Sequence, residues 1–308
     1  MAQHPCAQAR IVAPDYQLGE QPLSYEQIPD WQQRAAAFSL PALPQVWGWG
    51  TVHQATSSFI QLAVASARRT LADTPAQQVD TVIFCSSSLP ADANQQTRLL
   101  RDFADALALH HAEIIGVTLG RCTNLLKGLR LAEARIASGQ STQILLVASD
   151  CMEEPAQRLE NFALFSDGAA SCLVVRHDDP RPGFDILASA EQQDLKLIPE
   201  GLSSALATAV NQQLFRDTQI TLADVSRLFH TNVFLPLCNL KERQAGYAEH
   251  QLFTDNIVRI GHCFSADPLI NLTDAIRRQL LPEQGIFQLA ASIPGARAAV
   301  LLQKRREE

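Results

Sequence analysis

The feature that most restricts the fold is a repeated plan, because the two halves of the chain run through similar segments in the same order. In the first half, a segment with helical apolar spacing at 58–73 precedes the apolar run VDTVIFCSSS at 79–88. In the second half, a helical segment at 202–217 precedes DVSRLFHTN at 224–232. Self-similarity within one chain indicates repeated structural units. We therefore expect two related halves packed about a pseudo-twofold axis.

Both halves then continue alike. Each reaches a Gly-x-Cys tripeptide that opens a helical pattern, GRC at 120–122 and GHC at 261–263, and we take the two tripeptides as equivalent. Two apolar runs follow each helical pattern: QILLVAS (143–149) and AASCLVV (169–175), then GIFQLAAS (285–292) and ARAAVLL (296–302). Unbroken apolar strands that alternate with helices predict an α/β protein with mostly parallel sheets covered on both faces. A linker near RHDDPRPG at 176–183 divides the chain into predicted domains at 1–178 and 183–308.

Composition argues against several classes of partner. The 308 residues carry a formal net charge of -7 and no run of lysine or arginine, which disfavours nucleic acid. No apolar run approaches the ~18–20 residues that span a bilayer, and the N-terminal segment lacks the apolar core of a signal peptide. Seven cysteines without a Cys-x-x-Cys pair disfavour a disulfide framework and a zinc site. We expect a cytoplasmic protein with no metal, membrane or nucleic-acid contact.

Three side chains are candidates for chemistry. Cys122 follows a predicted strand and begins a helix, whose N-terminus stabilises a thiolate; alternatively it is a buried structural cysteine. His230 ends a predicted strand, where open α/β sheets bind ligands, or it is a structural histidine. His262 and the adjacent Cys263 form a metal pair, a nucleophile with its base, or two unrelated core residues, although no third metal ligand is evident. Because a pseudo-twofold would bring the two Gly-x-Cys turns together, we predict that Cys122, His230 and His262 converge on one site for acyl transfer.

Three segments resemble the thiolase-fold condensing enzymes, and most of all the β-ketoacyl-ACP synthase III family. CTNLLKGLRLAEARIASGQSTQILLVASD (122–150) is similar to the family's nucleophile helix and the strand that follows it. LFSDGAASCLVV (164–175) is similar to its Phe-Gly-Asp-Gly-Ala-Gly-Ala turn, and LFHTN (228–232) to its His-Gln-Ala-Asn motif. The resemblance covers about residues 58–303 and implies a thiolase-like fold, a five-layer αβαβα sandwich.

The resemblance also implies roles for the candidate residues. Cys122 falls on the nucleophile and His230 on the first catalytic histidine, while His262 stands where synthase III enzymes have an asparagine. The resulting Cys-His-His trio is similar to that of the elongating ketosynthases. The backbone N–H groups of Cys122 and Ser292 would hold the oxyanion of the tetrahedral intermediate.

Other positions fall on the family's substrate contacts. Trp31 resembles the tryptophan that stacks on the adenine of CoA, with Arg158 as the opposing arginine. Leu89 falls on the residue that reaches across the dimer interface into the partner's acyl pocket. The resemblance implies no cofactor, because thioesters of CoA or phosphopantetheine are substrates, and it implies acyl-CoA or an acyl carrier protein as partner. A homodimer through the strand at 112–118 is expected, with a heterodimer as the alternative.

Two reactions can follow acylation of Cys122. In a decarboxylative Claisen condensation with a malonyl-type thioester, His230 and His262 would donate hydrogen bonds to the enolate. In simple transfer to an alcohol, amine or thiol, one histidine, more readily His230, would act as the base. The resemblance places condensation first, in a specialised pathway of secondary metabolism or fatty-acid modification. A catalytically silent structural partner in a thiolase-fold heterodimer is the non-enzymatic alternative.

Overall fold

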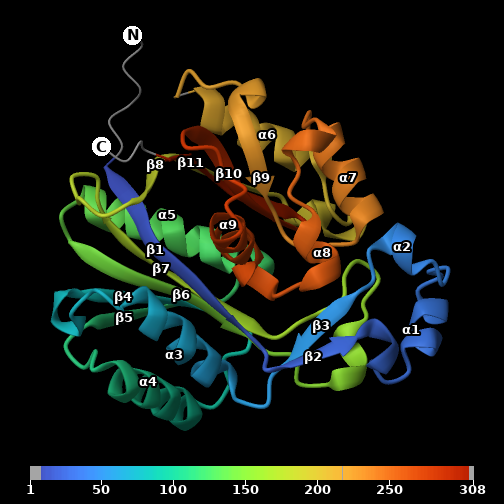
Figure 1. Cartoon of the computed structure of the whole chain (residues 1–308), viewed down its shortest axis with the longest axis horizontal. Helices are drawn as coiled ribbons and strands as arrows, with labels where there is room; N and C mark the ends of the chain where they lie inside the picture. The colour runs from blue at the N-terminus through green and yellow to red at the C-terminus, as the bar shows by residue number, and fades with distance from the viewer. Residues whose placement is uncertain (1–7, 217, 305–308) are drawn as a thin grey trace.

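The computed structural model describes residues 8–216 and 218–304, and its elements are stacked in five layers (Figure 1). Helices form the two outer layers and the middle one. From the lower outer layer to the upper one in Figure 1, they are α3 (Phe59–Thr70) and α4 (Ala93–Leu107), then the central α5 (Asn124–Ala137) and α9 (Asp267–Arg277), then α6 (Ser204–Arg216) and α7 (Leu235–Gln244). The expected αβαβα sandwich is therefore confirmed.

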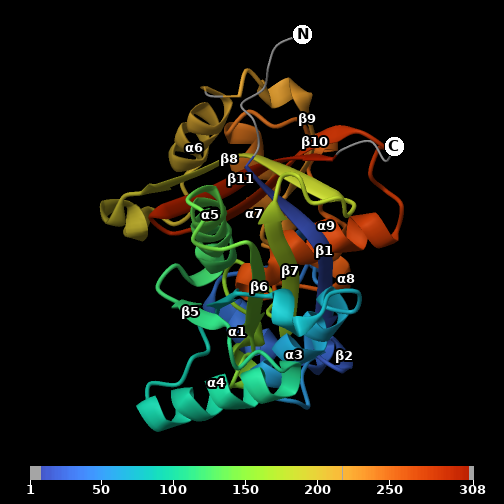
Figure 2. The same cartoon turned by 90° about the vertical axis from the view of Figure 1, so that its left-hand side faces the viewer.

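The two β layers are parts of one continuous nine-stranded sheet in the described residues, with strand order β5-β4-β6-β7-β1-β8-β11-β10-β9. The strands are β1 (Ala9–Leu18), β4 (Thr81–Cys85), β5 (Glu113–Val117), β6 (Gln143–Asp150), β7 (Gly168–Arg176), β8 (Gly183–Gln193), β9 (Val225–Phe229), β10 (Gly285–Ile293) and β11 (Ala296–Lys304). Only a short stretch of β1, Arg10 to Val12, pairs with β8. Figure 2 shows β8 and β11 running across the direction of β1, β7 and β6, so the two parts of the sheet can cover opposite faces of α5 and α9.

The repeated plan is visible in the strand pairing. In the first part, β4 is parallel to β6, which is antiparallel to β7, which is antiparallel to β1. In the second part, β9 is parallel to β10, which is antiparallel to β11, which is antiparallel to β8. The edge strand β5 pairs with β4 alone and has no counterpart among the described strands of the second part. The expectation of mostly parallel sheets is wrong, because antiparallel pairings outnumber parallel ones in the described sheet.

Two of the central strands, β1 and β8, are absent from the sequence prediction. The register of β1 against β7 shifts between Val12 and Asp15, and Ala13 has a left-handed φ of 48°. Pro14 lies in this bulge, where a residue without an N–H group is tolerated. The bulge and its proline interrupt the apolar run, so the sequence here does not show the continuous apolar pattern of a buried strand. β8 begins at Gly183, where the predicted linker ends.

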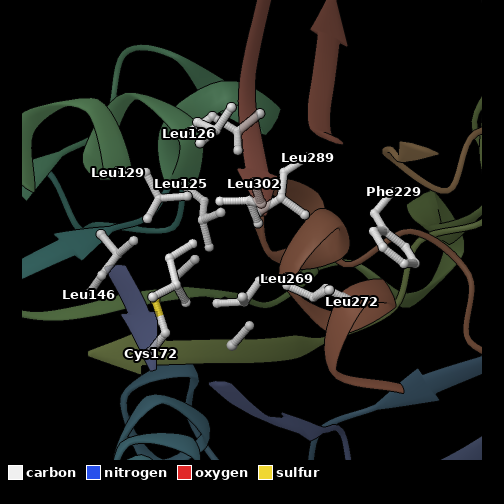
Figure 3. Close-up of a cluster of buried hydrophobic side chains, with 14 of the residues drawn as sticks. Leu125, Leu126, Leu129, Leu146, Cys172, Phe229, Leu269, Leu272, Leu289 and Leu302 are labelled. Carbon is white, nitrogen blue, oxygen red and sulfur yellow. The ribbon is translucent and has the colours of Figure 1, made fainter. Parts of the chain in front are cut away.

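The largest hydrophobic core lies between the two parts of the sheet, around α5 and α9. Leu125 and Leu129 of α5 are one helical turn apart and fully buried, as are Leu269 and Leu272 of α9. Figure 3 shows side chains from both central helices meeting side chains from both parts of the sheet. Burying each large apolar side chain stabilises the fold by about 1.5–3 kcal/mol. This core fixes the two helices, and hence the turns from which they start.

A smaller lobe flanks the sandwich at the right-hand edge of Figure 1. It contains the two-stranded sheet of β2 (Gln21–Ser24) and β3 (Thr51–Gln54), with the short helices α1 (Trp31–Ala37), α2 (Pro44–Trp47) and α8 (Asp255–Arg259). Short 3-10 turns connect other elements: η1 (Tyr25–Gln27), η2 (Ala76–Gln78), η3 (Arg121–Thr123), η4 (Pro155–Arg158), η5 (Leu195–Glu200), η6 (Leu222–Asp224), η7 (Glu249–Gln251) and η8 (Phe264–Ala266). Among the described helices, none combines the length and apolarity needed to cross a membrane.

Candidate active site

Cys122 lies in the 3-10 turn η3 at the start of α5, and the backbone there is tightly fixed. Arg121, immediately before it, has a φ of 49° in the left-handed region that side chains seldom adopt. The buried Asn124 side chain accepts a hydrogen bond from the Gly120 N–H at 2.8 Å. A side chain on Gly120 would place its Cβ only 2.8 Å from that same Asn124 oxygen. These constraints leave Cys122 partly exposed at a helix N-terminus.

His262 approaches Cys122 from the other half of the chain. Its Nε2 lies 3.2 Å from Cys122 Sγ, and the imidazole is fully buried. The preceding Gly261 has a φ of 78°, and a Cβ at this position would lie 2.8 Å from the Leu164 carbonyl oxygen, so glycine is required. The His262 N–H donates to that carbonyl at 2.7 Å. The predicted meeting of Cys122 and His262 is thus present in the structure.

Asp267, the first residue of α9, completes a line of three side chains. Its Oδ2 accepts a short hydrogen bond from His262 Nδ1, and its Oδ1 accepts the Cys263 N–H at 2.6 Å. The Asn232 N–H donates to Oδ2 at 2.7 Å. The order is Cys122, His262, Asp267: a thiol, an imidazole and a carboxylate that orients the imidazole, which is the arrangement found around activated nucleophiles. The sequence analysis did not identify Asp267. The feature that could have indicated it is an acidic residue at the start of a predicted helix, five positions after His262.

The environment of His262 favours its charged form. Burial alone lowers the pKa of His262, but the Asp267 carboxylate and the Cys122 sulfur outweigh burial and raise that pKa to about 10. An imidazolium carries protons on both nitrogens, so Nδ1–H is held by Asp267 and Nε2–H is directed at the sulfur. Among the described residues, no group of three His, Cys, Asp or Glu side chains is placed to hold a metal ion.

Three phenylalanines surround the His262 ring. The ring centroids lie 4.7 Å from Phe165, 6.0 Å from Phe264 and 6.1 Å from Phe162. Phe264 has a left-handed φ of 53°, which is strained for a bulky side chain and is a feature that concentrates at functional sites. The rings keep water from the His262–Asp267 pair and so strengthen its electrostatic interaction.

His230 is buried at the end of β9 and differs from His262 in its protonation. Its Nδ1 lies 2.6 Å from the Thr231 carbonyl oxygen, which can only accept, so Nδ1 carries the proton and Nε2 carries a lone pair. Burial lowers the pKa of His230, which keeps the ring neutral. Cys238 Sγ lies 3.0 Å from Nε2.

The backbone of His230 is tied to the same cluster as Asp267. Asn271 donates to the His230 carbonyl oxygen at 2.8 Å and to Asn232 Oδ1 at 2.9 Å, and Asn232 in turn binds Asp267. Across residues 8–216 and 218–304, no side-chain hydrogen bond joins His230 to Cys122 or His262. The structure therefore brings Cys122 and His262 into direct contact, while the catalytic role of His230 stays a prediction.

Ser292 lies near the end of β10, and η3 packs against that strand. Arg121 Nη2 lies 3.4 Å from the Pro294 carbonyl oxygen, so the turn of Cys122 touches the β10–β11 turn. The predicted oxyanion donor and the nucleophile therefore come from neighbouring segments.

The prediction that Arg158 opposes Trp31 around an adenine is wrong. Arg158 is 1% exposed, and its Nη2 lies 2.7 Å from Asp167 Oδ2 in a buried ion pair, so its guanidinium cannot stack on a ligand at the surface. Trp31 is half-buried at the start of α1, with its ring centroid 5.2 Å from that of Tyr25. Leu89 is half-buried after β4. The roles of Trp31 and Leu89 stay predictions.

The equivalence of the GRC and GHC tripeptides is also wrong, by two positions. The Gly120 N–H bonds to Asn124 Oδ1, four residues on, and the Cys263 N–H bonds to Asp267 Oδ1 in the same way. The left-handed residue follows at once in both turns, at Arg121 and at 264, and a 3-10 turn then leads into the central helix. The counterpart of Gly120 is therefore Cys263, and His262 precedes the repeated turn.

Comparisons with known proteins show a partial similarity in sequence. The family model described as 3-oxoacyl-[acyl-carrier-protein (ACP)] synthase III matches residues 118–194. Beta-ketoacyl-[acyl-carrier-protein] synthase III of Rickettsia akari is 26% identical over 184 residues, and the match covers 56% of this chain and 57% of that relative. The match thus spans little more than half of the length of that curated relative.

Solved structures share the whole fold at low sequence identity. The 3-oxoacyl-(acyl carrier protein) synthase III of Pseudomonas aeruginosa has a TM-score of 0.78 at 19% identity, covering 97% of this chain and 99% of its own. The synthase III of Aquifex aeolicus has a TM-score of 0.78 at 14% identity, covering 96% and 100%. A variant of OleA from Xanthomonas campestris has the same TM-score at 14% identity, covering 96% and 98%. The chain is therefore similar in sequence to synthase III proteins over part of its length and shares their fold.

Proposed function

We propose that this chain is an acyltransferase that forms an acyl thioester on Cys122 and passes the acyl group to an alcohol, amine or thiol. One observation supports this most directly: His262 Nε2 lies 3.2 Å from Cys122 Sγ, while Asp267 binds the other nitrogen of the ring. A sulfur nucleophile paired with an imidazole that a carboxylate orients is the arrangement used for covalent acyl transfer.

In the first half-reaction, the Cys122 thiolate attacks the carbonyl carbon of an acyl-CoA or acyl carrier protein thioester. A carbon–sulfur bond forms, and the backbone N–H groups of Cys122 and Ser292 hold the oxyanion, where losing one donor typically costs about 10²–10³ in rate. The bond to the original thiol then breaks, and His262 Nε2–H protonates the departing sulfur. Acyl-Cys122 and a neutral His262 remain, with Nδ1–H still held by Asp267.

In the second half-reaction, the acceptor attacks the carbonyl carbon of acyl-Cys122. Its proton passes to His262 Nε2 or to the bare Nε2 of His230, and Cys122 leaves as a thiolate. The pKa values of the two histidines are shifted in opposite directions, up for His262 and down for His230. Two groups whose pKa values are shifted apart commonly take separate acid and base roles. His262 therefore serves as the acid of the first step, and His230 as an additional base in the second.

Decarboxylative condensation with a malonyl-type thioester is the second candidate, and similarity to the synthase III proteins favours it. That reaction requires hydrogen-bond donors to the enolate oxygen. In the tautomer inferred from the contact between His230 Nδ1 and the Thr231 carbonyl oxygen, His230 Nε2 carries a lone pair and accepts rather than donates. Transfer to a heteroatom acceptor therefore ranks first, which reverses the order suggested by sequence resemblance. The direct contact between Cys122 and His262 favours either enzyme over a silent structural partner.

The test separates acylation from transfer. Intact protein is incubated with a panel of acyl-CoA thioesters, and the mass adduct is expected in the unsubstituted protein and in Cys263→Ser but not in Cys122→Ala. The acylated protein is then offered amines, alcohols and thiols, or malonyl-CoA. Loss of the adduct to a heteroatom acceptor without CO₂ release is the expected result. Release of CO₂ together with consumption of the adduct would establish condensation instead, and a folded protein that accepts no acyl group from any CoA or carrier-protein donor would rule out both reactions.

A further inference from the structure

A buried ion pair lies behind Ser292, and none of the steps above uses it. Arg297 on β11 is 1% exposed and Glu242 on α7 is 6% exposed. The guanidinium and the carboxylate meet through two hydrogen bonds, from Nη1 to Oε1 at 2.6 Å and from Nη2 to Oε2 at 3.0 Å. Two-point pairing of this kind fixes the orientation of the guanidinium plane. Arg297 is therefore held rigidly within the fold.

The same guanidinium binds the side chain of Ser292. Arg297 Nη1 donates to Ser292 Oγ at 2.9 Å, and the two residues are direct partners in the β10–β11 register. The hairpin closes immediately beyond them, at Ile293 opposite Ala296. The next carbonyl along the turn, that of Pro294, is the one that Arg121 approaches. A rigid chain of contacts therefore runs from Glu242 through the hairpin end to the turn of Cys122.

Stability alone does not explain why two charges are buried here. Replacing a buried ion pair with apolar side chains of similar volume is often neutral or stabilising, because the charges lose their hydration. A residue that donates to an oxyanion, in contrast, acts well only when its position is set before the reaction begins. Misplacing such a group by about 1 Å can lower the rate a hundredfold.

We propose that Arg297, oriented by Glu242, is a positioning residue for the acylation step, because its bond to Ser292 Oγ fixes the strand end that carries the Ser292 N–H. This inference rests on the proposed function, in which that N–H is an oxyanion donor. Arg297 itself touches no reacting atom in the scheme. Its effect is confined to steps in which a tetrahedral oxyanion forms, of which acylation is the first.

Two reactions of the same sulfur provide the test. Acylation of Cys122 by p-nitrophenyl acetate passes through an oxyanion, whereas alkylation by iodoacetamide does not. Ser292→Ala keeps the backbone N–H and removes only the Oγ acceptor, and Arg297→Lys keeps the charge and loses the two-point geometry. Both variants are expected to lower the acylation rate by about ten- to a hundredfold and to leave alkylation within about twofold. Acylation of the double variant should be no slower than that of Arg297→Lys, because both substitutions remove the same hydrogen bond, from Arg297 Nη1 to Ser292 Oγ.

The matched control is Arg10→Lys, which alters another buried pair, with Arg10 Nε 2.9 Å from Asp185 Oδ1. Asp185 pairs with Gln303, at the opposite end of β11 from Arg297. This control should acylate normally. If Arg297→Lys does not fold, Ser292→Ala still decides the matter, because it leaves the ion pair intact.

The outcomes separate the two proposals. Normal acylation in both Ser292→Ala and Arg297→Lys, or an equal loss of acylation and alkylation, would refute the positioning role alone. Acylation that depends on Ser292 but is followed by no transfer to any heteroatom acceptor would refute the proposed acceptor class and leave the positioning role standing. An unsubstituted protein whose Cys122 is alkylated but never acylated would refute both.

Discussion

The turns that begin α5 and α9 share a backbone design but hold different chemistry. Both turns place a polar residue at the first helical position, Asn124 in α5 and Asp267 in α9. The side-chain oxygen of that residue accepts a hydrogen bond from the backbone N–H of the residue four places earlier. Two residues before that position stands Cys122 in the first turn and Ser265 in the second. Cys122 is partly exposed, whereas Ser265 is fully buried. The two turns therefore share a backbone conformation but do not present equivalent side chains to the site.

The difference between an amide and a carboxylate explains this asymmetry. Asn124 has one acceptor oxygen, which Gly120 occupies, and its NH₂ group donates to the Thr118 carbonyl at 3.0 Å. Asp267 has two acceptor oxygens, so one can hold the turn while the other binds His262 Nδ1. The first turn consequently presents a sulfur, and the second orients an imidazole towards it. The candidate active site is assembled from the two halves: one turn supplies the sulfur, and the other supplies the imidazole and its carboxylate partner.

The largest expected effect separates Cys122 from its counterpart Ser265. Cys122→Ala should abolish acylation by any thioester, because no other described thiol contacts His262. Ser265→Ala should leave the acylation rate within about twofold, because this hydroxyl is buried and lies outside the Cys122–His262–Asp267 line. Intact mass after incubation with acyl-CoA measures both. Loss of acylation in a folded Ser265→Ala protein would show that the second turn takes part in the chemistry.

A smaller but still large effect is expected from exchanging the two helix-starting residues. Asp267→Asn keeps an oxygen for the Cys263 N–H but removes the charge that holds His262, so acylation should fall by about 10²–10³. Asn124→Asp removes the donor to the Thr118 carbonyl and should lower stability by about 1–3 kcal/mol, with a less than tenfold effect on acylation. Single-turnover acylation and thermal unfolding distinguish the two. Equal kinetic losses in both variants would contradict the division of roles between the turns.

The smallest expected effect is a change in stability with pH. Because the pKa of His262 is raised from 6.5 to about 10 in the folded protein, its contribution is complete below pH 6.5 and is lost as the pH rises through 10. The difference in Tm between the unsubstituted protein and His262→Asn should therefore shrink between pH 6.5 and 10. The exposed His111 provides the control, since His111→Asn should show no such trend. A Tm difference for His262→Asn that stays constant over this range would contradict the imidazolium–carboxylate pairing.

Several buried strands of the sandwich were predictable because each coincides with a short unbroken run of apolar residues in the sequence. The runs 143–149 and 169–175 coincide closely with β6 and β7. The strand β1 escaped prediction because its bulge and Pro14 break the apolar run, although it pairs on both sides inside the sheet. A central position in the sheet is a property of the neighbouring strands rather than of the segment itself.

The amino-acid sequence by itself determined the alternation of strands and helices and the start of a helix near Cys122. Its resemblance to a known family also predicts that His262 stands in place of an asparagine. Only the tertiary structure decided which groups meet. His262 contacts Cys122 although the two residues are 140 positions apart in the sequence. Asp267 binds the other ring nitrogen of His262. Arg158 lies in a buried ion pair with Asp167 and not at the surface. The physical reason is that local patterns report which face of a segment is apolar, whereas a hydrogen bond depends on the relative placement of two segments to within a fraction of an ångström.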